Sequence, residues 1–294
     1  MNTNSLSERA MLVSLNIRRW QANLTDKKIT KEVASSHAVK EKRAGKYKKN
    51  AIDVEAKTFK GVVTATSELR AKHYFYTLPW SQEGARILPA AMFEEYSQET
   101  RVLKAAFEKA VKAFVEDYPL LKAAASVELN GMYNAKDYPV NIAAKFGVDV
   151  VMMPLPAEED FRVSLPDLAL AEIKEGIRAE VSQSLQAAMR DPYERLYKHI
   201  SRMVDRLSDP KGHVHDTLVS GLAELCTVLP GLNIANDPQL DELRRRAERM
   251  IVNLTPQDLR DRPAMRRNVA REATQIQQLM SVYMGAAPAA EEAA

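Results

Sequence analysis

The strongest constraint on the fold is an apolar stripe in the C-terminal half of the chain. An α-helix has about 3.6 residues per turn, so apolar residues spaced three or four positions apart share one helical face. Such residues recur, with one step of seven, at Leu170, Ile173, Ile177, Val181, Leu185, Met189, Leu196, Ile200, Met203 and Leu207. Asp191 and Pro192 interrupt the stripe and predict either a second helix that begins there or a kink.

A stripe of this length must be covered, since a broad apolar face is unstable in water. The chain can cover it by folding back on itself or by pairing with a second copy. We therefore expect a homo-oligomer. The residues expected to carry self-association are Ile173, Ile177, Val181, Leu185, Leu196 and Ile200.

The remaining sequence predicts a mainly α protein with a small antiparallel β-sheet, which is an α+β fold. Only ten glycines and 6% aromatic residues favour helix over strand. Alternating or aromatic segments predict strands at 11–20, 73–78, 148–154 and 161–165, the last two forming a hairpin with an acidic turn. Helical periodicity predicts helices within 26–69, at 90–118 with Pro119 as the stop, and at 214–229, 238–252 and 263–284.

These elements suggest three regions. We expect a basic α+β region at residues 1–165, a helical bundle or arm at 166–284, and a disordered, low-complexity tail at 285–294.

Charge is distributed unevenly along the chain. Residues 1–75 hold sixteen Lys and Arg against seven Asp and Glu, whereas the rest of the chain holds 26 against 32. A basic segment of this kind is where DNA, RNA or an acidic protein surface would dock. The candidate binding residues are Lys27, Lys28, Lys31, Lys40, Lys42, Arg43, Lys46, Lys48 and Lys49. Tyr47 and the aromatic stretch from His73 to Trp80 could stack on bases, although a solvated lysine face and an aromatic core explain the same residues.

Other motifs predict no catalytic or cofactor site. Asp167, Glu172 and Lys174 match the letters of a PD…ExK nuclease signature, but four residues between the carboxylates leave no room for a hairpin. His213 and His215 open an expected helix, where positions two apart diverge, so we expect no metal there. A second arginine cluster at 244–249 is offset by nearby acids, which favours ion pairs within the helix.

Three segments carry a resemblance: LSERAMLVSLNIRRWQANLTDKKITKEV, TLPWSQEGARILPA and PLPAEEDFRVSL. Together they resemble an uncharacterised family of proteins of similar length encoded by bacteriophages and prophages. Genes of that family often lie near those for a MoxR-type AAA+ ATPase and a von Willebrand A-like protein. The resemblance implies an AAA+ ATPase partner and a bacterial host cell, and it supplies no catalytic residues.

The single cysteine, Cys226, favours a reducing compartment, and the polar N-terminus and the longest uncharged stretch (273–290) predict no export and no membrane span. We therefore expect a cytoplasmic protein. The first functional hypothesis is a non-enzymatic phage assembly or binding protein that acts through protein contacts and self-association. The alternatives are a nucleic-acid-binding accessory factor, and a metal-dependent enzyme whose carboxylates would be Asp149, Glu158, Glu159 and Asp160.

Overall fold

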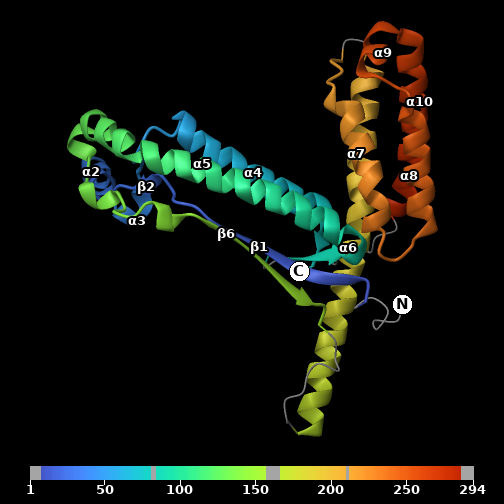
Figure 1. Ribbon diagram of the computed structural model, residues 1–294, viewed down its shortest axis with the longest axis horizontal. Coiled ribbons are helices and arrows are strands. Elements are labelled where there is room, and N and C mark those ends of the chain that lie inside the picture. The colour runs from blue at the N-terminus through green and yellow to red at the C-terminus, as the bar shows by residue number, and fades with distance from the viewer. Residues whose placement is uncertain (1–7, 81–83, 157–165, 210–211, 286–294) are drawn as a thin grey trace. The chain divides into compact units, whose positions relative to one another are not determined.

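The computed structural model describes residues 8–80, 84–156, 166–209 and 212–285 (Figure 1). It confirms a mainly helical protein with a small four-stranded antiparallel sheet and long C-terminal helices. The chain divides into two compact units that are discontinuous in sequence. Unit 1 comprises Met1–Ser14, Tyr76–Glu94 and Met152–Ala294, and unit 2 comprises Leu15–Phe75 and Glu95–Val151. The sequence had predicted continuous regions, with boundaries after residues 165 and 284.

Unit 1 is built around the long helix α6 (Asp167–Ser208). Figure 1 shows α7 (Thr217–Leu232), α8 (Pro238–Ile251) and α10 (Pro263–Gly285) along the C-terminal half of α6, with the short α9 (Pro256–Asp261) before α10. Leu196, Ile200 and Met203 of α6 are completely buried there. The chain thus covers this half of the apolar stripe with its own helices. Pro192 lies inside one continuous helix, so no second helix begins at that point.

The sheet has the strand order β4-β5-β1-β6. Its strands are β4 (Leu78–Pro79), β5 (Ala85–Pro89), β1 (Ala10–Arg18) and β6 (Gly147–Pro154). β1 pairs with β5 in antiparallel register, with Ala10 opposite Pro89 and Ser14 opposite Ala85. The predicted strands at 11–20 and 148–154 are therefore present, whereas β5 was not predicted. The predicted strand at 161–165 lies outside the described residues.

The prediction of a strand from residue 73 was wrong. Residues 73–76 form the last turn of helix α4 (Lys57–Tyr76). Leu69 and His73, four positions apart, are both buried, so the segment follows a helical rather than an alternating pattern. Burial of that face outweighs the strand preference of the aromatic residues around it.

Unit 2 is held together by α4 and α5 (Phe93–Glu128), which lie side by side in Figure 1. An aromatic cluster fills the space between them, in which Trp20 stacks on Phe114 at 6.4 Å and meets Tyr118 edge-on at 5.8 Å. The smaller elements of this unit are β2 (Asn23–Thr25), α2 (Lys27–Ser36), α3 (Glu41–Ala44), β3 (Lys48–Asn50) and three single 3₁₀ turns, η2 (Asn130–Met132), η3 (Ala135–Asp137) and η4 (Ala143–Lys145).

The predicted stop at Pro119 was also wrong, because α5 continues through it to Glu128. A proline inside a helix removes one backbone hydrogen bond and crowds the preceding turn. Here Pro119 is exposed, and Tyr118 and Ala125 are buried on either side of it. Packing of these two residues on the core offsets the local cost of the proline.

Candidate nucleic-acid interface

Eight of the nine predicted basic residues form an exposed surface on unit 2. They lie on α2, α3, β3 and the segments between them, which Figure 1 shows gathered at one end of the unit. We call this the basic surface, and its members are Lys27, Lys28, Lys31, Lys40, Lys42, Arg43, Lys46 and Lys48, all exposed.

Local hydrogen bonds fix the elements that carry these side chains. Asp26 caps α2, because its carboxylate accepts hydrogen bonds from the backbone N–H groups of Lys28 and Ile29 at 3.0 and 3.1 Å. The backbone of Tyr47 is held on both sides, since its carbonyl accepts from Asp26 N–H at 2.9 Å and its N–H donates to Thr30 Oγ1 at 3.1 Å. Tyr47, which lies between two lysines in the sequence, is 41% exposed.

Lys49, the ninth predicted residue, does not belong to this surface. β3 turns successive side chains to opposite sides, so Lys48 faces solvent while Lys49 is 7% exposed. The Lys49 ammonium lies 3.0 Å from the Asp26 carboxylate and 3.0 Å from that of Asp137, and it donates to the Met132 carbonyl. The three N–H donors of the ammonium are thereby used within the protein. The prediction that Lys49 binds a partner is therefore corrected.

The charges of this cluster stabilise one another. Burial lowers the pKa of Lys49, but the hydrogen bonds that its ammonium donates to the Asp26 and Asp137 carboxylates outweigh that effect, and its pKa is raised. The pKa of Asp26 is lowered, first by the hydrogen bond from Ile29 N–H and then by that from Lys49. Lys49 therefore stays charged and acts as a link between β3, the start of α2 and η3.

The basic surface lacks acidic partners of its own. Within the described part of the chain, none of the eight side chains has a nitrogen within 4 Å of a carboxylate oxygen. The arginine cluster on α8 behaves differently, because Arg244 and Arg245 both bind Asp241, at 3.0 and 2.6 Å. That cluster is neutralised within its helix, as its sequence predicted.

A hollow of about 590 Å³ borders the basic surface. Lys27 and Lys28 line it together with Tyr133 of the η2–η3 segment, and so do the Asp26 and Asp137 carboxylates that hold Lys49. This concave region joins the exposed cations to an aromatic ring. Sequence patterns alone do not reveal the hollow, because the residues that line it come from segments about a hundred positions apart.

The second predicted group of aromatic residues is separate from this surface. His73 is buried, and its Nδ1 lies 3.0 Å from the hydroxyl of Tyr96 in the core. His73 lies in the last turn of α4, a helix of twenty residues that is about 30 Å long and begins shortly after β3 in the sequence. The aromatic residues beside the basic surface are therefore Tyr47 and Tyr133, and the ring of Tyr133 also contacts that of Tyr138, with 5.1 Å between the ring centroids.

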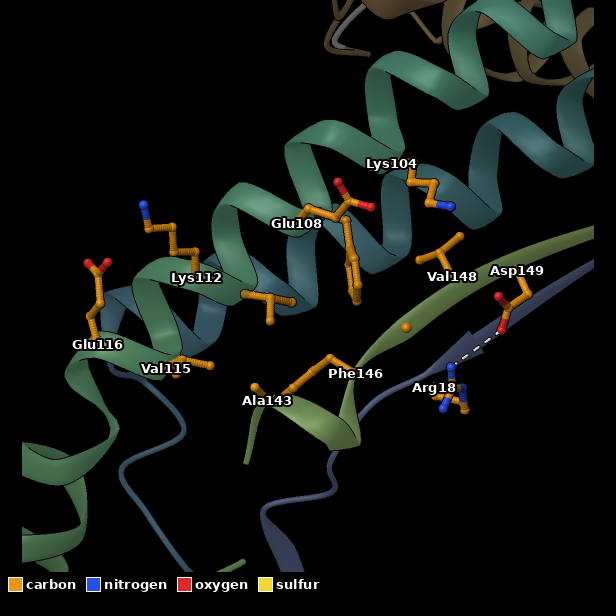
Figure 2. Close-up of a pocket in the computed structure, with 13 residues that line it drawn as sticks. Arg18, Lys104, Glu108, Lys112, Val115, Glu116, Ala143, Phe146, Val148 and Asp149 are labelled. Carbon is orange, nitrogen blue, oxygen red and sulfur yellow. Dashed lines mark hydrogen bonds and ion pairs between the residues drawn. The ribbon is translucent and has the colours of Figure 1, made fainter. Parts of the chain in front are cut away.

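A different hollow, of about 580 Å³, lies between α5 and the start of β6. Figure 2 shows its apolar floor, to which Phe146 and Val148 contribute, and the charged residues around it. Arg18 and Asp149 form an exposed ion pair of 3.5 Å on the strand side. A Cβ at Gly147 would come within 2.6 Å of the Arg18 guanidinium, but that exposed side-chain end can move aside, so the pair does not by itself require glycine.

The structure also places the residues of the nuclease-like motif, the two histidines and the carboxylates proposed for a metal. Residues 167–174 of the nuclease-like motif all lie in α6, so the hairpin that such a site needs is absent. His213 and His215 precede α7 and are not its first residues. Their ring centroids are 4.4 Å apart, whereas the sequence predicted that the two side chains would point away from each other. No group of three metal-binding side chains occurs among residues 8–80, 84–156, 166–209 and 212–285. Of the proposed metal carboxylates, Asp149 pairs with Arg18, and residues 158–160 lie outside the described ranges.

Cys226 is a core residue. It is 3% exposed, and burial raises the pKa of its thiol to about 11. A thiol with this pKa is almost entirely protonated at neutral pH and is a poor nucleophile.

The structure corrects the predicted self-association surface in part. Val181, Leu196 and Ile200 are buried within this chain and cannot contact a second copy without unfolding. Ile173, Ile177 and Leu185 are only partly covered. Sequence periodicity identified the apolar face, but it could not show which half the chain's own helices cover.

Among the described helices, none combines the length and the apolar composition needed to cross a membrane. Scans against models of protein families, curated proteins and solved structures find no match to this chain. The resemblance to the phage family therefore stays a prediction.

Proposed function

We propose that this chain is a non-enzymatic binding protein and that nucleic acid docks on the basic surface of unit 2. The observation that carries this proposal is the set of eight exposed cations without an ion-pair partner in the described chain. Cations that are already paired have their charge compensated, whereas unpaired cations gain by replacing the counterions of a polyphosphate.

Two further features favour nucleic acid over an acidic protein surface. Tyr47 is held by its backbone with its ring exposed between Lys46 and Lys48, which suits stacking on an unpaired base. The adjoining hollow places Tyr133 close to Lys27 and Lys28, so phosphate contacts and a second stacking contact can occur together. A single-stranded ligand uses both features, whereas a duplex uses only the charges.

The experiment is a fluorescence-anisotropy titration of the full chain with labelled single- and double-stranded oligonucleotides at about 50 and about 200 mM salt. The test variant combines Lys42→Glu, Arg43→Glu and Lys46→Glu. The control variant reverses three exposed cations elsewhere, Lys198→Glu, Arg202→Glu and Arg267→Glu, and has the same net charge. We expect binding that weakens with salt and that only the test variant loses, by at least about tenfold.

Three results would overturn the proposal. One is the absence of binding to either oligonucleotide at the lower salt concentration. Another is an equal loss in both variants, because net charge alone would then explain the binding. The third is equally strong binding of polyglutamate with the same loss in the test variant, which would assign the basic surface to an acidic protein partner.

An assembly role in a phage, with an AAA+ ATPase as partner, rests on the sequence resemblance and stays a prediction. Copurification of the ATPase with this chain, in the presence of ATP, would test it.

A further inference from the structure

α5 carries charges that alternate at four-residue steps. Lys104, Glu108, Lys112 and Glu116 are all exposed, and Figure 2 shows them along the helix beside the apolar hollow. Residues four apart are neighbours on a helix surface, so the four side chains form one row. Within the described chain, none of the four takes part in an ion pair, even with the next member of the row.

Two copies of this row are complementary in charge when they lie antiparallel to each other. A two-fold axis at the level of Ala110 would place Lys104 opposite the partner's Glu116, and Glu108 opposite the partner's Lys112. By symmetry the same two contacts form again, so every charge in the row meets its opposite. A parallel arrangement in register would instead place each charge against its own kind.

We propose that a second copy of this chain docks antiparallel on this face of α5. Rows of residues at four-residue steps pack side by side when two helices cross at about 50°, which is the commonest helix packing. Leu120 extends the row by one turn and is 71% exposed. Docking brings it opposite the partner's Thr100, so the contact also covers apolar surface.

The adjoining hollow provides the apolar part of the contact. Its floor includes Phe107 and Phe146, and Val111 and Val115 of α5 line it half-buried. Charges at the margin of such a floor fix the direction and register of a contact more than they add affinity. This surface replaces the buried part of the stripe on α6 as the site of self-association.

The test is the mass of the full chain by sedimentation equilibrium at low salt. In the Lys112→Glu variant, two glutamates face the partner's two at the centre of the contact, and we expect the dimer to dissociate at least about tenfold more readily. Adding Glu108→Lys exchanges the two charges and restores opposite pairs, so the double variant should recover the wild-type mass.

Lys109→Glu is the matched control, because residue 109 is exposed on the same helix but lies outside the row. It should leave the dimer unchanged, and circular dichroism should show native helix content in all variants. A strictly monomeric wild-type chain at high concentration would overturn the proposal. An unchanged dimer mass in the Lys112→Glu variant would also overturn it, as would a double variant that does not recover the wild-type mass.

Discussion

The ammonium of Lys49 lies 3.0 Å from the carboxylate of Asp26, the residue that also caps helix α2. The contact joins two elements that are both short, a three-residue strand and a ten-residue helix. Such elements have little stability of their own. The buried cation thus holds in place the scaffold on which the exposed cations of the basic surface are presented.

Replacing Lys49 by Met should destabilise unit 2. The substitution leaves the Asp26 and Asp137 carboxylates close together without their shared cation, and breaking a buried ion pair in this way costs about 3 kcal/mol. Urea unfolding followed by the fluorescence of Trp20, in a Trp80→Phe background, measures the change within unit 2.

Lys48→Met is the control for this experiment. It removes the same charge from the neighbouring, exposed position, and it should alter the free energy of unfolding by less than about 0.5 kcal/mol. Equal effects of the two substitutions would mean that the Lys49 cluster does not stabilise the fold.

The same cluster predicts how stability changes with pH. The folded-state pKa of Asp26 is lowered, so its contribution is complete above its unfolded pKa of about 3.9 and is lost as pH falls through the folded value. The pKa of Lys49 is raised, so its contribution is complete below about 10.4 and is lost as pH rises through the folded value.

Asp26→Asn isolates the acid side of this dependence, since asparagine still caps a helix but carries no charge. The variant should be less stable than the wild type at neutral pH, and the difference should shrink as the pH falls below about 4. Asp205→Asn, at an exposed position of α6, should match the wild type throughout. A constant deficit of the Asp26 variant at all pH values would contradict the assignment.

The sequence predicted those elements whose signals are local. α8 and α10 begin at Pro238 and Pro263, the positions at which the sequence predicted helices to start. β1 includes the alternation of apolar and polar residues from Val13 to Arg18, although the neighbours Leu12 and Val13 are both buried. A cap, a proline or a two-residue period acts over one turn or one strand, so it can be recognised without knowledge of the tertiary structure.

The missed features depend on residues that are distant in sequence. Lys49 is buried because Asp137, 88 positions later, approaches it, and nothing within the lysine-rich stretch distinguishes it from Lys48. Likewise the charge alternation on α5 is visible in the sequence, but its exposure beside an apolar hollow is not. Packing of distant segments decides which members of a motif reach solvent.

One further long-range contact lends itself to a test. The guanidinium of Arg266, on α10, donates hydrogen bonds to two backbone carbonyls in the last turn of α6, those of Arg206 and Leu207, and to two beyond its end, those of Asp209 and Gly212, at 2.5 to 3.2 Å. The last carbonyls of a helix have no partner within the helix, so Arg266 supplies the missing donors and fastens α10 to α6.

Arg266→Met should therefore lower the free energy of unfolding by about 2 kcal/mol, because four carbonyls, two of them in part-buried contacts, lose a charged donor. Arg266→Lys should recover only part of the loss, since an ammonium cannot reproduce the planar fork of the guanidinium. Arg267→Met removes the neighbouring exposed charge and serves as the control. Urea unfolding monitored by circular dichroism compares the three. If Arg266→Met and Arg267→Met unfold at the same urea concentration, the carbonyl contacts contribute nothing to the stability of unit 1.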